Sequence, residues 1–313
     1  MENESYKNAL PEIELVLRDE HIDVEKKQKV TKVTHVISLI IIYAFLTLAG
    51  LIMVFPFYWM IITSLKGGAE IQRLVPTYWP MVIRWDNYAT AFSRLNFAII
   101  LRNTLIVGVL STLGTLLTTI FAAFAFARLE FKGKDFIFRL LLTTMMIPGE
   151  MMVISNYVSV SNLGFTDGSA VGAYAAMVLP FMVSIFYIYL LRQNFKQIPN
   201  ELYLAAKVDG KSDWQFLWKV MVPLAMPTIT TILILKLMGT WNAYVWPNLI
   251  ASGTKELYLI TNGLRESFNV ADNYDEYGAQ MAATVIVTLP LLFVFIFCRK
   301  YIMRGVSRAG IKG

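Results

Sequence analysis

Few residues of this chain have types that do covalent chemistry. Its one cysteine is Cys298, and its two histidines are His21 and His35. These three do not have the spacing of a Cys/His zinc site, so the sequence predicts no metal site. The sequence also places no group of histidine, cysteine and carboxylate side chains at one depth along its predicted helices, as a catalytic site requires. We therefore expect a protein that is not an enzyme, with no catalytic residue.

One short motif imitates a nucleotide site. Gly210-Lys211-Ser212 reads like the end of a phosphate-binding loop. Such a loop also needs a glycine five residues before Gly210, where Ala205 lies, and a preceding strand. We therefore expect this chain to bind no ATP and no other cofactor itself.

The composition places the chain in a membrane. Hydrophobic residues make up 56% of the 313 residues, charged residues 16%, and the mean hydropathy is +0.54. This is more apolar surface than one soluble core needs. Residues 1–32 carry mixed charge without the apolar segment of a removable signal, so we expect them to form a cytoplasmic arm.

Stretches without charge predict six membrane-spanning helices in an all-α domain at 33–303. A helix needs about 20 apolar residues to cross the hydrocarbon core. Residues 33–65, 103–127 and 277–298 contain no Asp, Glu, Lys or Arg. Residues 140–191 hold only Glu150 and Asp167 and fit two spans around a turn-like segment, and residues 220–254 hold only Lys236. The predicted spans are 36–63, 103–127, 137–157, 172–191, 223–250 and 279–302.

Lysine and arginine in the connections predict the orientation. The arm, the second and fourth connections and the tail hold 20 of them, against 7 in the opposite set. Since basic connections favour the cytoplasm, both termini, the loop 192–222 and the tail 304–313 are predicted to be cytoplasmic. Topology accounts for the excess basicity, so we expect membrane lipid and no nucleic acid as a partner.

Two charged residues, Glu150 and Lys236, fall inside predicted spans, where charges usually pair or line a cavity. Glu150 lies 11 residues from Arg139, and Lys236 lies 13 residues from Pro223. At about 1.5 Å per residue they lie roughly 16 and 20 Å deep. One hypothesis is a pair, or two separate polar groups, beside a polar path. The other is that Glu150 binds backbone groups at a kink while Lys236 extends to the interface.

The kink itself is predicted at Pro148-Gly149. Near the end of the fifth span, Trp241, Asn242, Tyr244 and Trp246 combine apolar faces with hydrogen-bonding edges, which suits a sugar ring. The alternative for the tryptophans is the ordinary aromatic belt at the interface. Asn103 and Asn156, near other span ends, complete the candidates for a substrate path.

The segment from Glu201 to Pro227 is predicted to form two short helices joined at an elbow. It is rich in helix formers, and Gly210 allows the positive φ that ends a helix sharply. Asp209 is a candidate cap for the second helix, and Trp214 a candidate anchor for a partner. The alternative is an amphipathic helix whose aromatic side chains face lipid headgroups.

This segment carries a specific resemblance. LAAKVDGKSDWQFLWKVMVP at 204–223 resembles the EAA loop of ABC importer permeases, with Ala205, Ala206, Gly210 and Pro223 in register. Leu204 stands where the family has glutamate, and Glu201 is the candidate substitute.

Further motifs extend the resemblance to most of the chain, and to the carbohydrate-import branch. The nearest likeness is the smaller permease of maltose-type importers. The motifs are Asn103-Thr104, AFAFARLEFKGK at 123–134, MMIPGE at 145–150, WNAYVWP at 241–247, MAATVIVTLP at 281–290 and RAGIKG at 308–313.

The resemblance implies a type I ABC importer permease fold in the bacterial inner membrane, working by alternating access. It implies a sugar substrate, a second permease, two cytoplasmic ATPases that use ATP and Mg, and an extracytoplasmic solute-binding protein. The residues it implies for ATPase coupling are Glu201, Leu204, Ala205, Ala206, Asp209, Gly210 and Trp214. A stand-alone secondary transporter or channel is the alternative function, but the inverted repeats and paired carboxylates typical of one are not evident in the sequence.

Overall fold

The computed structural model describes residues 35–268 and 273–310. The predicted arm 1–32 and residues 311–313 of the predicted tail lie outside this range. The chain divides into two compact units, Met1–Trp59 and Met60–Gly313. Of the first unit, the described part is the beginning of the helix His35–Ser64, whose apolar side chains are almost all exposed, as expected of a lipid-facing helix.

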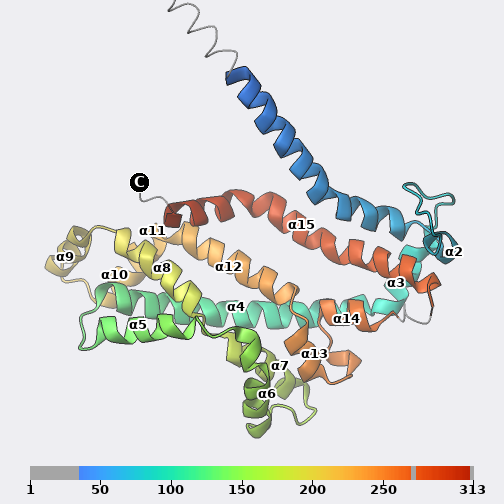
Figure 1. Ribbon diagram of the computed structural model, residues 1–313. Helices are drawn as coiled ribbons and strands as arrows, with labels where there is room; N and C mark the ends of the chain where they lie inside the picture. Colours follow the sequence, from blue (N-terminus) through green and yellow to red (C-terminus); the bar gives the residue numbers. More distant parts are fainter. Residues whose placement is uncertain (1–34, 269–272, 311–313) are drawn as a thin grey trace, which may run out of the picture. The chain divides into compact units, whose positions relative to one another are not determined.

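The described parts of the second unit are helical and have no strand. They begin with α2 (Gly68–Ile71), α3 (Asp86–Leu95) and α4 (Phe97–Arg128), and end with α15 (Asp275–Gly310). The helix α4 starts at Phe97, earlier than the predicted span at 103, because Asn96 before it adopts a left-handed φ of 42°. In Figure 1, α9 lies at one end of α4, and α2 and α3 lie toward the other.

α4 is the central element of the second unit, and it packs against α5, α7, α8, α12 and α14. Small side chains along α4 let these neighbours approach closely, as is common between membrane helices. The buried small residues of α4 include Gly108, Ser111, Gly114, Thr115, Thr119 and Ala123.

Three helices of the described chain are long and apolar enough to cross a membrane unbroken: His35–Ser64, Phe97–Arg128 and Glu276–Lys300. Three bent pairs meet the same test, which gives up to six spans by length and composition. The first pair is α5 (Lys134–Thr144) with η1 (Gly149–Met152) and α6 (Val153–Asn162). The second is α7 (Ala170–Val178) and η2 (Leu179–Phe181) with α8 (Ile185–Gln197). The third runs from α10 (Asp213–Phe216) through η3 (Leu217–Met221) and α11 (Val222–Leu224) to α12 (Met226–Trp241).

Prolines lie at these bends. The bend angles are 87° after α5, 47° after η2 and 76° before α12. Pro148 lies in the first break, Pro180 lies in η2 just before the second, and Pro227 is the second residue of α12 just after the third. A proline lacks the N–H of a regular helix and its ring crowds the preceding turn. The kink predicted at Pro148-Gly149 is therefore present, and it is close to a right angle and not a gentle bend.

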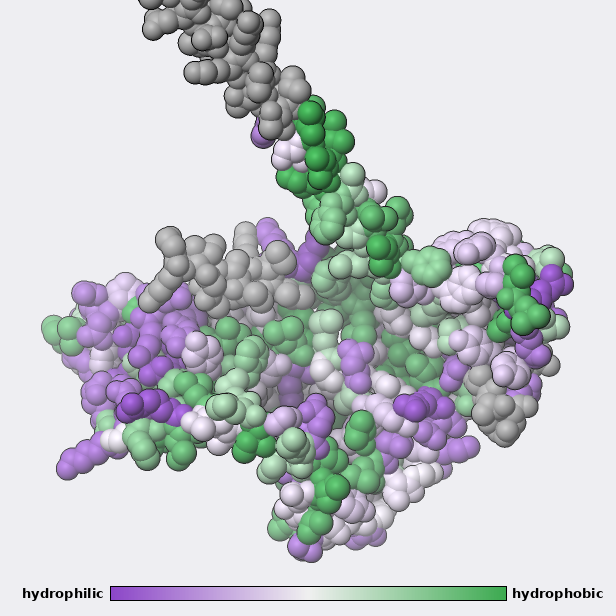
Figure 2. Space-filling model, viewed as in Figure 1, coloured by the Kyte–Doolittle hydropathy of each residue, from purple (hydrophilic) through white to green (hydrophobic). Residues whose placement is uncertain are grey.

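The remaining elements are short. After α12, the chain forms α13 (Val245–Ala251), η4 (Lys255–Leu257) and α14 (Ile260–Glu266). The predicted fifth span, 223–250, thus contains a break at Asn242–Tyr244. Figure 2 shows hydrophilic residues gathered at the end of the second unit that holds α9.

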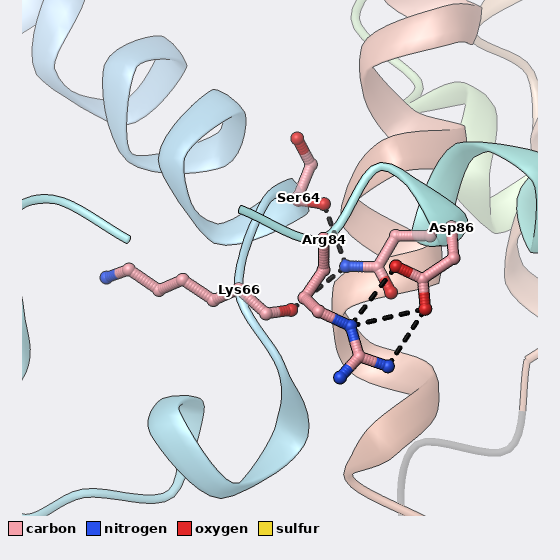
Figure 3. A network of polar contacts seen from close by, with 5 residues as sticks. Ser64, Lys66, Arg84 and Asp86 are labelled. Carbon is pink, nitrogen blue, oxygen red and sulfur yellow. Dashed lines mark hydrogen bonds and ion pairs between the residues drawn. The ribbon is translucent and has the colours of Figure 1, made fainter. Parts of the chain in front are cut away.

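The connection from Ser64 to α3 is held by polar contacts (Figure 3). The Asn87 amide donates to the carbonyls of Ser64 and Lys66, both at 2.9 Å. Arg84 forms an exposed ion pair with Asp86, with Nη2 and Oδ2 2.9 Å apart. The Lys66 ammonium donates to the Thr77 carbonyl, and burial lowers the pKa of Lys66. These bonds give the connection a fixed shape without long helices.

Candidate functional site

The segment predicted as an elbow forms two short helices. The helix α9 (Asn200–Val208) ends at Gly210, whose φ is +70°, and α10 follows from Asp213. Gly210 N–H donates to the Lys207 carbonyl at 3.0 Å, and Lys211 N–H to the Ala206 carbonyl at 2.8 Å. The glycine therefore has the role predicted for it, since its φ is strained for other residues.

The predicted cap of the second helix is wrong. Asp209 occupies the C-cap position of α9, and Ser212 is the N-cap of α10. Ser212 Oγ accepts from Gln215 N–H, and the Gln215 side chain accepts from Ser212 N–H, both at 3.3 Å. This reciprocal capping box satisfies two free amides, whereas Asp209 lies one turn too early to reach them.

We predict that Ser212→Ala destabilises the elbow by about 1 kcal/mol, because the N-cap acceptor is lost. The measurement is the thermal unfolding midpoint of the purified chain. Ser212→Asp, which keeps an acceptor at the N-cap, is the control. Equal midpoints for all three proteins would contradict the role of the cap.

Ion pairs and hydrogen bonds brace the elbow. Asp213 accepts from the Tyr203 hydroxyl at 2.7 Å and from Lys207 Nζ at 2.8 Å. The Asp213 hydrogen bond raises the pKa of Lys207. The stabilisation of the folded chain by this ion pair is therefore fully present below the ordinary pKa of lysine. It is lost as the pH rises through the raised pKa of Lys207. At neutral pH these contacts connect α9 with α10.

Arg128 joins the elbow to α4. Its guanidinium donates to the carbonyls of Phe195, at 2.9 Å, and Ile198, and to the Asn200 side chain at 3.3 Å. In the sequence, Arg128 stands in the motif at 123–134 and among the basic residues of the second connection, and neither pattern predicts these bonds. The feature of the sequence that marks Arg128 is its position as the first charged residue after the long apolar stretch 103–127.

The two faces of α9 differ in exposure. Tyr203 and Ala206 pack against the buried cluster that includes Phe195 and Phe216. Tyr203 and Phe216 have ring centroids 5.1 Å apart. The opposite face of α9, which we call the α9 outer face, consists of four exposed residues at helical spacing: Glu201, Leu204, Ala205 and Val208.

This outer face is markedly apolar for an exposed surface. Val208 is 88% exposed and Leu204 is 55% exposed. Beyond the elbow, Trp214 is 60% exposed, although its ring stacks on Phe121 at 5.8 Å and meets Trp218 at 5.7 Å. Of the predicted coupling residues, Ala206 faces inward, and the others lie on the surface of the elbow.

A second feature is a cavity of about 970 Å³. It lies among α4, the segment η1–α6, η2 with the start of α8, and α12 with the start of α13. Its lining is mostly apolar with a few polar groups, which is typical of a small-molecule site. The lining includes the side chains of Ser111, Glu150, Phe181, Tyr187, Lys236, Thr240 and Tyr244.

The cavity brings together Glu150 and Lys236 from spans far apart in sequence. Lys236 Nζ donates to the Phe181 carbonyl at 2.9 Å and lies 5.8 Å from the centre of the Phe181 ring. Within the part of the chain that the structure describes, no ion pair joins Lys236 to Glu150. In this conformation the two charges are separate polar groups on one lining.

Tyr244 and Trp246 also line the cavity. The Tyr244 hydroxyl donates to Glu266 at 2.9 Å, and the Trp246 indole donates to the Ala176 carbonyl at 3.1 Å. The other candidates for a substrate path lie outside the lining. Trp241 donates from its indole to the Val287 carbonyl at 3.3 Å, and the Asn242 amide donates to the Met238 carbonyl at 2.9 Å. Asn156 lies on α6 and is partly exposed.

Asn103 is a residue of α4 and is fully buried where α4 contacts the segment before α14. Its amide donates to the carbonyls of Glu256, at 2.7 Å, and Tyr258, at 3.0 Å, while its oxygen accepts from the Tyr174 hydroxyl at 2.7 Å. The structure thus gives Asn103 a bracing role. A buried amide and a cargo-binding amide have the same sequence signature, so the sequence does not separate the two.

Comparison with known proteins places these features in a family. Residues 114–308, more than half of the chain, match the family described as binding-protein-dependent transport system inner membrane component. The chain is 29% identical over 268 residues to the lactose transport system permease protein LacG of Rhizobium radiobacter, covering 85% of this chain and 94% of that protein. It is 29% identical over 273 residues to the arabinooligosaccharides transport system permease protein AraQ of Bacillus subtilis, covering 86% and 94%.

A solved structure shares the fold. A chain of a bacterial ABC transporter involved in the import of the acidic polysaccharide alginate matches with a TM-score of 0.72 and 24% identity, covering 84% of this chain and 95% of that one. The expected permease fold is therefore confirmed. The chain belongs to the family of inner membrane components of binding-protein-dependent transport systems, and is a transport permease subunit.

Proposed function

We propose that this permease subunit imports a sugar or oligosaccharide, delivered by an extracytoplasmic binding protein and driven by ATP hydrolysed on separate subunits. The names of relatives support the substrate class: lactose for one, arabinooligosaccharides for another, and diacetylchitobiose for a permease of Streptomyces coelicolor. The cavity's aromatic and hydroxyl side chains suit a sugar ring.

The observation that carries the coupling half of this proposal is the α9 outer face. An exposed apolar surface beside an ion-paired elbow is costly in water and favours a protein partner. The proposed partners are two cytoplasmic ATPases, which use ATP and Mg, and a second permease. On this proposal both termini and α9 are cytoplasmic, and the chain itself binds no nucleotide.

Displacement of α9 by the ATPases is then transmitted to the rest of this subunit through contacts within the chain. When the ATPases close on ATP, the docked α9 is displaced, and the Asp213 bonds carry α10 with it. The Arg128 bonds connect the same movement to the end of α4, which lines the cavity further along. Access to the cavity thereby alternates between the two sides of the membrane.

The test is crosslinking combined with transport. In a Cys298→Ser background, Val208→Cys is expected to crosslink to an ATPase subunit in membranes. Val171→Cys, on α7 and comparably exposed, is not expected to do so. Proteoliposomes holding the whole complex are expected to accumulate oligosaccharide when ATP and binding protein are supplied.

Two results would contradict the proposal. One is labelling of Val208→Cys by an impermeant thiol reagent from outside the cell without any ATPase crosslink. The other is sugar uptake by vesicles containing this chain alone without ATP, which would establish the secondary transporter instead.

A further inference from the structure

The Lys236 ammonium lies on the cavity lining with part of its hydrogen-bonding capacity unused. An ammonium group has three donors. In the described structure one of them goes to the Phe181 carbonyl at 2.9 Å, and the Phe181 ring lies 5.8 Å away. Lys236 therefore has donors left for a group that enters the cavity.

The Phe181 carbonyl does not depend on Lys236 for a partner. The Thr115 hydroxyl also donates to this carbonyl, at 3.0 Å, and the Thr118 hydroxyl donates to the neighbouring Met182 carbonyl at 2.6 Å. Two carbonyl groups at the break between η2 and α8 thus already accept hydrogen bonds from threonines of α4. A purely structural role explains the position of Lys236 less well than a binding role does.

Charge balance supports the same conclusion. The cavity's other charged side chain is Glu150, and among the described residues it forms no ion pair with Lys236. An ammonium inside a membrane protein is costly without a compensating anion. The described chain places no carboxylate within 4 Å of Lys236, so an anion that enters the cavity would compensate its charge.

We propose, building on the proposed function, that the cargo is an anionic sugar, and that Lys236 binds its carboxylate or phosphate group. The rest of the lining suits the neutral part of such a cargo. Phe181, Tyr187 and Tyr244 offer aromatic faces to sugar rings, and Ser111 and Thr240 offer hydroxyls. Glu150 accepts from sugar hydroxyls and repels a second anion at its side of the cavity.

The experiment uses the whole reconstituted complex with saturating loaded binding protein and internal ATP. Uptake is compared for trigalacturonate and its neutral counterpart galactotriose, and for a 6-phosphorylated disaccharide and its neutral parent. We expect Lys236→Met to slow uptake of the anionic cargo on the order of 10-fold, because a hydrogen bond to a charged group is lost. Uptake of the neutral sugars is expected to change by less than about twofold on the same reasoning.

Three further variants complete the design. Lys236→Arg is expected to restore uptake of the anionic cargo, and Glu150→Gln to increase it by removing the repelling charge. Lys219→Met, an exposed lysine on η3 outside the cavity, is the matched control and is expected to change neither class. Trigalacturonate and the phosphorylated disaccharide distinguish a carboxylate from a phosphate as the group bound.

The outcomes separate this inference from the proposed function. A wild-type complex that imports neutral sugars but neither anionic sugar overturns the inference and leaves the proposed function intact. Equal losses for anionic and neutral sugars in Lys236→Met also overturn it, since Lys236 would then serve the structure or pair with a carboxylate of the second permease. Failure of the wild-type complex to import any sugar with ATP overturns the proposed function itself.

Discussion

Leu204→Asp combined with Val208→Asp is expected to reduce ATP-driven uptake at least 10-fold while leaving the chain folded. Both residues lie on the α9 outer face, so a charge there meets water in the isolated chain and costs little. In the assembled transporter the same charges would be buried against the ATPase without a partner, which is strongly unfavourable. The measurements are copurification of the ATPase subunits and uptake into proteoliposomes.

The control for this prediction is Leu163→Asp. Leu163 follows α6 and is 67% exposed, so it introduces the same charge on a comparable apolar surface away from α9. It is expected to leave copurification unchanged. If the double variant copurifies its ATPases and transports normally, the α9 outer face is not the docking surface.

Asn103→Leu is expected to destabilise the chain by about 2 to 5 kcal/mol, the second large effect. The substitution keeps the approximate size but leaves the Glu256 and Tyr258 carbonyls and the Tyr174 hydroxyl without their partner. An unsatisfied group costs about 1 to 3 kcal/mol where it is buried, as at the Tyr258 carbonyl, and less where it is partly exposed, as at the Glu256 carbonyl. The apparent unfolding midpoint of the purified chain should fall by roughly 5 to 15 °C on this estimate.

Two variants make the prediction specific. Asn156→Leu, the same substitution at a partly exposed position on α6, is expected to shift the midpoint far less. Tyr174→Phe, which removes only the bond to the Asn103 oxygen at 2.7 Å, is expected to lie between them. A stable Asn103→Leu protein with weakened sugar uptake would instead support the cargo-binding role that the sequence suggested.

The elbow shows how far sequence reasoning reaches when the determinants are local. The end of α9 depends on one glycine with positive φ, and the apolar outer face depends on helical spacing, so both follow from neighbouring residues. The cap was harder to predict, since Asp209 and Ser212 are both good N-cap types. The choice between them depends on where α9 stops, which a single sequence locates only to within a few residues.

The bent helices show the opposite case. Proline and glycine at 148–149 predict a kink, but not that the two halves differ in direction by 87°. The angle is fixed by what each half packs against, and proline removes the hydrogen bond that would otherwise keep the halves aligned. The ends of the helices therefore differ from the limits predicted from charge-free stretches.

The sequence alone determined the all-α membrane class, the elbow and the family, because apolar length, glycine position and motif spacing are properties of the chain in order. Only the tertiary structure decided that Lys236, Glu150 and Tyr244 line one cavity, whereas Asn103, Trp241 and Asn242 do not. Which side chains share a cavity depends on the rotation and bending of helices that are distant in sequence. Those are set by packing, since small side chains on α4 determine how closely and at what angle its neighbours approach.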